Sequence, residues 1–293
     1  MCILDCPLLG LAWVEENKFI IDAKELKGAE IALNFASVGA TINLMLASVK
    51  AEGKTTIYNA AKEPEIVNVA SFLNNMGANI QGAGTSTIKI TGVKKLGHAI
   101  VDVIPDRIEA GTYIIAGALI GDNLKISNII PEHLASLLVK LKEMNINYVE
   151  TTNEIIISRC QNAKATDIKT GVYPGYPTDL AQPICVLLAN ATGTSHLTET
   201  IYAKRMGHVE YLKQMGANID IIDNTEIITG PSKFYGTDVE ASDLRAGATL
   251  FLAALIAEGK TNITNIQYIL RGYENIVKKL SNVGANIHIE EIK

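Results

Sequence analysis

The sequence predicts an α/β fold (α+β in its mixture of sheets) built from repeated units in two domains, of which the first is incomplete. A five-residue pattern recurs at intervals of about 70 residues, as MGANI (76–80), MNINY (144–148), MGANI (215–219) and VGANI (283–287). Self-similarity at a regular spacing is the signature of a repeat architecture. Each pattern ends a helical stretch and precedes a β-branched run, so helices alternate with strands and are expected to cover the sheets.

The first repeat unit, residues 28–97, reads strand, helix, strand, helix, strand. A β-rich run at 29–36 precedes an amphipathic helix at 38–50, and Gly53 marks a helix stop before a strand at 55–59. A second helix at 65–76 and a closing strand at 87–91 follow, with a hairpin turn expected at Gly82 and Gly84. Two further strands are expected ahead of the unit, at 11–14 and 18–22.

Three more repeats are expected at 98–165, 166–236 and 237–293. Their helices are predicted at 111–120, 133–144, 180–190, 209–215, 244–257 and 273–283, and the last repeat ends with a strand at 288–292. Several first helices are apolar on nearly every side, which predicts that they are buried. The chain is therefore expected to divide into a domain at 1–103, with one complete unit, and a three-unit domain at 104–293.

Composition excludes several functional classes. The chain is 48% hydrophobic and 19% charged with a net charge of −5, which is typical of a globular protein and unlike a nucleic-acid-binding one. No apolar run reaches the roughly 18 residues of a membrane span, and residues 1–14 lack the features of a signal peptide, so a cytoplasmic location is expected. The four cysteines show no metal-ligand spacing, so neither a metal nor a cofactor is expected.

The loops before the first helices carry polar residues that suit anion binding. Each occupies a predicted helix start: Ser37, Asp106, Thr178 and Asp243. Free N–H groups and the helix dipole favour an anion there, although each residue would also serve simply as an N-cap. Capping does not explain Arg107 and Arg245, which follow closely. The turn YPGYP (173–177) presents Asp179 rigidly, which makes Asp179 a candidate general base.

The loops before the second helices place Arg205 and Arg271 at equivalent positions of neighbouring repeats. A single loop arginine is usually only solvated, but two such residues beside glycine suit bidentate binding of phosphate or carboxylate. His133 and His208 also begin helices, without a second metal ligand at a suitable spacing. The sequence contains none of the standard phosphate-loop, dinucleotide, nucleophile-elbow or zinc-protease motifs.

Six strings occur in an order that resembles the UDP-N-acetylglucosamine 1-carboxyvinyltransferase family: SVGAT (37–41), EPEIV (63–67), PDRIE (105–109), YPTD (176–179), DLR (243–245) and RGYE (271–274). The resemblance spans residues 11–293. It implies an inside-out α/β barrel of βαβαββ units. It also implies transfer of the enolpyruvyl group from phosphoenolpyruvate to the 3-hydroxyl of UDP-N-acetylglucosamine, the first committed step of peptidoglycan synthesis. The net charge and the lack of a long apolar run argue against a nucleic acid or a membrane as partner.

The resemblance implies roles for residues that would hold the nucleotide sugar. Ser37, Val38 and Gly39 would contact its diphosphate through backbone N–H groups, and Ile201 would line the uridine side. These residues come from different repeats, so the tertiary structure has to bring them together.

The resemblance also implies roles at the reacting groups. Asp179, next to Thr178, would bind the attacking sugar hydroxyl and act as base, and Arg271 would bind the carboxylate of phosphoenolpyruvate. Three further residues would lie at the domain cleft: Arg205, Asp243 and Arg245.

The sequence departs from this family at its start. The family's N-terminal Lys-Asn pair and its mobile loop with a reactive Cys or Asp have no counterpart, and neither Cys2 nor Cys6 matches that loop. Leu270 replaces an Asp, and Tyr173 stands where some members have His. The expectation is a truncated, impaired transferase whose incomplete first domain is the less stable part and self-associates through exposed edges. The alternatives are a non-catalytic nucleotide-sugar-binding protein and the sister activity on shikimate 3-phosphate.

Overall fold

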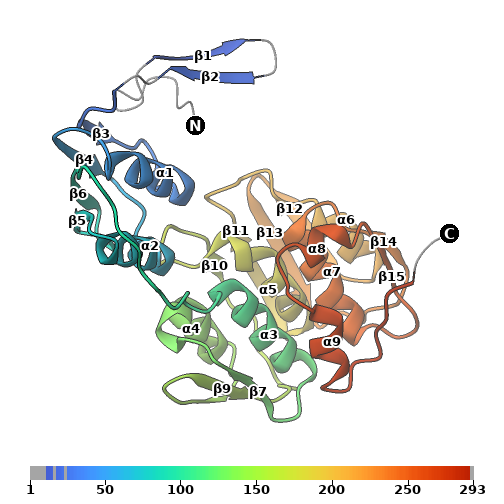
Figure 1. Cartoon of the computed structure of the whole chain (residues 1–293). Coiled ribbons are helices and arrows are strands. Elements are labelled where there is room, and N and C mark those ends of the chain that lie inside the picture. Colours follow the sequence, from blue (N-terminus) through green and yellow to red (C-terminus); the bar gives the residue numbers. More distant parts are fainter. Residues whose placement is uncertain (1–10, 16–17, 23–24, 291–293) are drawn as a thin grey trace. The chain divides into compact units, whose positions relative to one another are not determined.

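The computed structural model describes residues 11–15, 18–22 and 25–290, with side chains from residue 25 onward. The chain forms two compact units, Met1–Ile104 and Pro105–Lys293, each a mixture of helices and sheets (Figure 1). Among the described helices, none combines the length and the apolar character that a membrane span requires.

The first unit contains one complete βαβαββ repeat. Its sheet has four strands, listed in spatial order: β3 (Glu30–Ala32), β4 (Lys54–Tyr58), β6 (Thr87–Thr91) and β5 (Asn79–Gln81). Helix α1 (Val38–Ser48) connects the parallel strands β3 and β4, and α2 (Pro64–Asn75) leads to the antiparallel β5–β6 hairpin. The strands expected ahead of this repeat are present as the antiparallel pair β1 (Leu11–Glu15) and β2 (Lys18–Asp22).

Alternation of side chains along the strands explains how this sheet buries one face. In β6, Ile88 and Ile90 are buried while Lys89 between them is exposed. Ile57 of β4 and Met45 of α1 complete the same hydrophobic cluster. The predicted hairpin turn is confirmed, since Gly82 and Gly84 both have positive φ, +80° and +83°, where a glycine is favoured.

The second unit repeats this topology. One repeat again has four strands in the same spatial order: β10 (Ile168–Lys169), β11 (Gly193–Thr198), β13 (Thr225–Gly230) and β12 (Asn218–Ile222). The repeat before it has three: β7 (Leu124–Ser127), β9 (Glu154–Ile157) and β8 (Tyr148–Glu150). The last repeat has the parallel pair β14 (Asp238–Glu240) and β15 (Asn262–Thr264).

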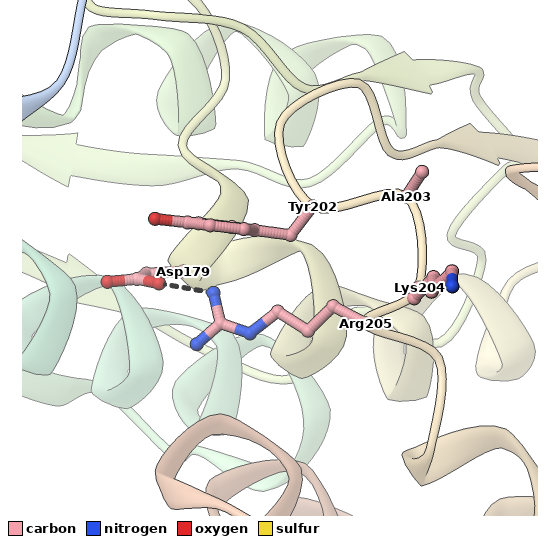
Figure 2. Close-up of a pocket in the computed structure, with 5 residues that line it drawn as sticks. All are labelled: Asp179, Tyr202, Ala203, Lys204 and Arg205. Carbon is pink, nitrogen blue, oxygen red and sulfur yellow. Dashed lines mark hydrogen bonds and ion pairs between the residues drawn. The ribbon is translucent and has the colours of Figure 1, made fainter. Parts of the chain in front are cut away.

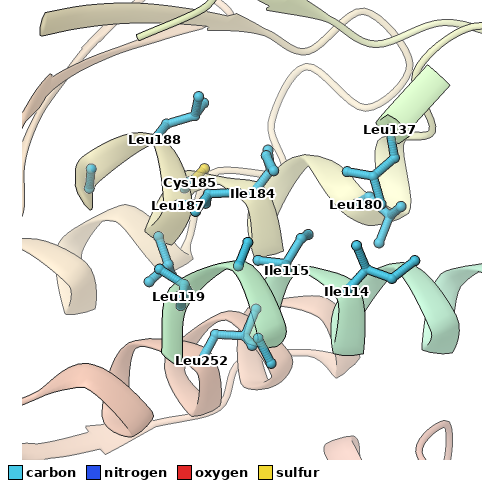
Figure 3. Close-up of a cluster of buried hydrophobic side chains, with 14 of the residues drawn as sticks. Ile114, Ile115, Leu119, Leu137, Leu180, Ile184, Cys185, Leu187, Leu188 and Leu252 are labelled. Atoms are coloured by element: carbon cyan, nitrogen blue, oxygen red, sulfur yellow. The ribbon is translucent and has the colours of Figure 1, made fainter. Parts of the chain in front are cut away.

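Three helices, one from each repeat of the second unit, pack against one another at its core: α3 (Arg107–Ile120), α5 (Thr178–Asn190) and α7 (Leu244–Ile256). Figure 3 shows their aliphatic side chains interdigitating. Every residue of α5 from Leu180 to Ala189 is buried, which confirms the prediction from its apolar sequence. At Gly111 of α3, a Cβ atom would lie 2.6 Å from Leu180 Cδ1, so α3 and α5 approach closely there and an alanine would force the Leu180 side chain to move.

The remaining helices of the second unit are shorter: a 3₁₀ turn (Pro131–Leu134), α4 (Ala135–Glu143), α6 (His208–Gln214), α8 (Gln267–Leu270) and α9 (Ile276–Ser281). The helix predicted at 273–283 is present but shorter, as α9, because Asn275 has a left-handed φ of +51° and separates Tyr273 from the helix. The strand predicted at 288–292 is wrong for 288–290, which are not in a strand. Residues 291 and 292 lie outside the described residues. The exposed strand edge expected at the end of the last repeat is therefore not formed by residues 288–290.

Candidate functional site

Asp179 stands in the first turn of α5 and pairs with arginines from two other segments of the second unit. Its Oδ1 atom is 2.7 Å from Arg205 Nη1, and its Oδ2 atom is 3.0 Å from Arg245 Nη2. Arg205 comes from the loop before α6, and Arg245 from the start of α7. The side chain of Asp179 is 35% exposed and that of Arg245 only 10%. The cluster therefore extends from the helical core to the surface.

A pocket of about 620 Å³ opens beside this cluster, within the size range of ligand sites. Its lining residues are Asp179, Tyr202, Ala203, Lys204 and Arg205. Figure 2 shows Tyr202 and Arg205 extending side by side toward Asp179, and the Arg205 guanidinium lies 5.5 Å from the centre of the Tyr202 ring. Among the lining residues, Lys204 and Arg205 outweigh the one carboxylate, so the pocket favours an anion. The exposed Tyr202 ring offers a flat surface for a planar group.

The two arginines keep Asp179 ionised. Burial alone would raise the pKa of this carboxyl, but the charges of Arg245 and Arg205 and their hydrogen bonds outweigh burial and lower it. The pKa of Arg245 is raised, because the attraction of Asp179 and contact with Tyr273 exceed the opposing effect of burial. Asp179 is therefore a weaker base than a free carboxylate while both arginines hold it.

Asp179 should accordingly make folding stability dependent on acidity. Its pKa is lower in the folded chain than the value of about 3.9 expected when unfolded, so its contribution is complete above that value and is lost as pH falls through the folded pKa. We expect Asp179→Asn to flatten the acid side of the stability curve, measured by urea unfolding between about pH 5 and pH 2. Equal loss of stability in wild type and variant over that interval would contradict this expectation.

Glu199, at the end of β11, anchors the pocket loop. Its carboxylate is buried and accepts hydrogen bonds from four donors: Thr170 Oγ1 (2.9 Å), Thr178 Oγ1 (2.7 Å), Ile201 N (2.6 Å) and Tyr202 N (3.0 Å). One side chain thus ties the loop bearing Tyr202 and Arg205 to the first turn of α5. A second tie is the amide of Gln182, which donates to the Arg205 carbonyl at 3.0 Å.

Thr178 and Ile201 both hold Glu199 in place by donating hydrogen bonds to its carboxylate. Thr178 is the first residue of α5 and Pro177 is the N-cap, so the expectation that Thr178 caps the helix is wrong. Both residues donate to Glu199, Thr178 through its hydroxyl and Ile201 through its backbone N–H. Sequence reasoning missed Glu199, whose one visible signal is a carboxylate between two threonines at the end of a strand.

Asp243 is an N-cap, as the simpler interpretation predicted. Its Oδ1 atom accepts from Arg245 N (2.7 Å) and Ala246 N (3.0 Å), which fixes the start of α7. Asp106 caps α3 in the same way, which starts that helix at Arg107, earlier than the predicted residue 111. Capping by Asp243 thereby sets the backbone from which Arg245 reaches Asp179.

Of the RGYE residues (271–274), Tyr273 contacts the cluster of Asp179, Arg205 and Arg245, whereas Arg271 lies over the ring of Tyr268. The fully buried Tyr273 hydroxyl lies 3.2 Å from Arg245 Nη1 and 3.0 Å from the Thr112 hydroxyl. The Arg271 guanidinium instead lies 5.7 Å from the centre of the Tyr268 ring. Arg245 is therefore held from both sides, by Asp179 and Tyr273, and sequence reasoning missed the second contact.

Ser37, Val38 and Gly39 form the N-terminus of α1 in the first unit. The Ser37 hydroxyl oxygen accepts from Ala40 N at 3.3 Å and caps the helix. A Cβ atom built at Gly39 would meet nothing within 4 Å, so the space next to this helix start is open. A negatively charged group can approach the free N–H groups there.

Comparison with known proteins finds the same family in sequence and fold. The sequence matches the family described as EPSP synthase (3-phosphoshikimate 1-carboxyvinyltransferase) over residues 12–280. It is 51% identical over 278 residues to UDP-N-acetylglucosamine 1-carboxyvinyltransferase 2 of Geobacillus kaustophilus, covering 95% of this chain and 65% of that protein. It is 54% identical over 272 residues to the protein of the same name from Staphylococcus aureus, covering 93% and 65%. The chain thus spans 65% of the length of these relatives.

Two solved structures have a similar fold. The enolpyruvyl transferase NikO from Streptomyces tendae superposes with a TM-score of 0.87 at 26% identity, covering 94% of this chain and 69% of that one. EPSP synthase from Acinetobacter baumannii superposes with a TM-score of 0.70 at 20% identity, covering 93% and 66%. The predicted α/β fold class, with helices packed inside an outer set of sheets, is confirmed.

Proposed function

Because the chain belongs to the EPSP synthase (3-phosphoshikimate 1-carboxyvinyltransferase) family, we propose that it serves in enolpyruvyl transfer from phosphoenolpyruvate to the 3-hydroxyl of UDP-N-acetylglucosamine. Its similarity to the relatives named for that reaction supports the UDP-sugar as acceptor over shikimate 3-phosphate. The observation that carries the proposal is Asp179 held between Arg205 and Arg245 beside a cationic pocket. The reaction would be the first committed step of peptidoglycan synthesis.

Enolpyruvyl transfer between two anionic substrates needs a general base and several positively charged side chains. The sugar hydroxyl adds through its oxygen to C2 of phosphoenolpyruvate, loses its proton to a base, and C3 gains a proton. Loss of a C3 proton and of inorganic phosphate then restores the double bond. We assign the base to Asp179. Arg205 and Arg245 would share the negative charge of the two anionic substrates, since cations positioned in advance stabilise developing charge without reorganisation.

The remaining predicted residues keep their proposed roles in substrate binding. The open N-terminus of α1 at Ser37, Val38 and Gly39 would hold the diphosphate, and Arg271 would hold the carboxylate of phosphoenolpyruvate. Within the pocket, the Tyr202 ring is the natural surface for the uracil base, next to the proposed contact at Ile201. Lys204, which lines the same pocket, would add positive charge there for an anionic substrate.

Calorimetric titration of the chain with each acceptor tests this proposal. We expect saturable binding of UDP-N-acetylglucosamine and at least tenfold weaker binding of shikimate 3-phosphate, a difference of about 1.4 kcal/mol. Release of inorganic phosphate from phosphoenolpyruvate, measured with and without the UDP-sugar, then separates a transferase from a protein that only binds nucleotide sugars. Tighter binding of shikimate 3-phosphate would overturn the assigned acceptor.

We further propose that the chain acts in the cytoplasm and self-associates through its first unit. Cys160 and Cys185 are free thiols, as a reducing compartment maintains them. Leu46 on α1 and Phe35 just before it are 47% and 43% exposed, and exposed apolar side chains promote association. Light scattering is expected to show an oligomer that the double substitution Leu46→Ser and Phe35→Ser shifts toward the monomer. A monomer in the wild-type chain at all concentrations would contradict this prediction.

A further inference from the structure

A second cluster of reactive side chains lies in the core of the second unit, apart from the pocket lining. It consists of Cys185 of α5, His208 of α6 and Glu226 of β13, all buried. Cys185 Sγ lies 2.9 Å from Glu226 Oε2 and 3.3 Å from His208 Nε2, and His208 Nε2 lies 3.3 Å from Glu226 Oε1. None of the three belongs to the mechanism proposed above.

The donor types and their spacing match a zinc site. Thiolate, imidazole and carboxylate are the ligands that zinc takes, at about 2.0–2.3 Å from the metal. Tetrahedral ligands at those bond lengths stand about 3.3–3.7 Å from one another. The three observed distances are equal to or slightly shorter than these, so an ion would enter with small outward movements of the side chains.

Charge balance points the same way. A thiolate and a carboxylate together neutralise a divalent cation, so a filled site buries no net charge, whereas an isolated buried carboxylate is costly. We propose that Cys185, His208 and Glu226 bind one zinc ion through Sγ, Nε2 and a carboxylate oxygen. The three donors come from separate elements, which the ion would join.

Binding must release a proton. In the metal-free site the Cys185 S–H group donates a hydrogen bond to Glu226 Oε2. When the Zn–S bond forms, that proton leaves to solvent, and the proton of a neutral His208 ring resides on Nδ1. Among the described residues Nδ1 has no hydrogen-bond partner, whereas zinc-bound histidines usually donate this proton to an acceptor. We therefore expect an affinity below that of structural zinc sites.

A metal at this site would stabilise the pocket, because two of its ligands lie on the helices on either side of the pocket loop. His208 begins α6 directly after the loop that bears Tyr202 and Arg205, and Cys185 lies on α5 farther along from Asp179. A metal at this point would lock α5, α6 and β13 together. Sequence spacing did not reveal it, because His208 and Glu226 lie 23 and 41 residues beyond Cys185 and meet only in the folded chain.

Zinc content and cobalt absorption of the full chain test the site. The variant with Cys2, Cys6 and Cys160 all replaced by Ser retains only the Cys185 thiol. After exposure to Zn²⁺ and desalting, we expect about one zinc per chain by mass spectrometry. With Co²⁺ in place of Zn²⁺, we expect the charge-transfer band of a thiolate-to-cobalt bond. Chelation should lower the temperature of thermal unfolding.

Two near-isosteric changes in that background identify the ligands. Cys185→Ser and Glu226→Gln should each weaken zinc binding by at least about 100-fold, while Glu210→Gln on the exposed face of α6 should leave it unchanged. Circular dichroism checks that each variant is folded. No zinc bound to the folded background chain, or zinc retained equally by all three variants, would overturn the proposal. Neither result depends on transferase activity.

Discussion

Asp179→Asn is expected to lower phosphate release in the presence of UDP-N-acetylglucosamine by about 10²–10⁴-fold, the usual contribution of a positioned base. The substitution keeps the shape of the side chain but removes the charge that Arg205 and Arg245 share. Binding of the UDP-sugar should weaken by about 1–3 kcal/mol, the scale of one hydrogen bond to a charged group. Calorimetry supplies this second readout independently of turnover.

Asp167→Asn is the matched control for this experiment. Asp167 is also an aspartate of the second unit with a lowered pKa, caused by hydrogen bonds from the His196 backbone and side chain, but it is exposed and away from the lining of the pocket. Its substitution should change neither rate nor affinity. If Asp179→Asn behaves like Asp167→Asn in both assays, Asp179 is neither the base nor a substrate contact.

Glu199→Ala is expected to destabilise the second unit by about 3–5 kcal/mol, because four hydrogen-bond donors lose a buried, charged acceptor together. The backbone N–H groups of Ile201 and Tyr202 cannot rotate to find another partner. The same change should release the pocket loop and weaken UDP-N-acetylglucosamine binding at least tenfold, since Arg205 would no longer be positioned against Asp179. Urea unfolding and calorimetry measure the two effects.

Two further variants make the result specific to Glu199. Glu210→Ala removes an exposed glutamate from α6 and should alter stability by less than about 0.5 kcal/mol. Glu199→Gln keeps one acceptor oxygen but turns an amide N–H₂ group toward donors, so it should recover only part of the stability and affinity. Stability and affinity of Glu199→Ala equal to those of Glu210→Ala would show that the carboxylate does not hold the loop.

Local patterns in the sequence were enough to predict the repeat and most of its helices and strands. Alternating apolar residues predicted β6, and helices apolar on all sides predicted the buried α5 and α7. The caps at Ser37 and Asp243 were predictable as well, because a capping side chain bonds only to backbone a few residues away. All these features depend on contacts within one element or on its period, which the order of residues specifies directly.

The local signals failed where a distant or irregular contact decided the conformation. The helix predicted to begin at Tyr273 begins later, at α9. The Tyr273 side chain is buried against Thr112 and Arg245, and the left-handed backbone of Asn275 turns the chain before α9. The spacing of apolar residues along the chain carries no information about contacts with residues as distant as Thr112. The short strand predicted after α9 fails at 288–290 for a related reason, since a strand needs a partner that the run itself does not specify.

Which charged side chains pair with one another depends on the packing of the folded chain. Asp179 lies 26 residues from Arg205 and 66 from Arg245, and only the packing of α5 with α7 brings the second pair to 3.0 Å. Glu199 and the Cys185 cluster likewise unite segments that carry no shared motif. Side-chain pairing across elements depends on helix packing and strand order, which the whole chain determines through its core. The sequence could therefore identify individual candidate residues such as Asp179, but the residues that contact them could be identified only in the folded chain.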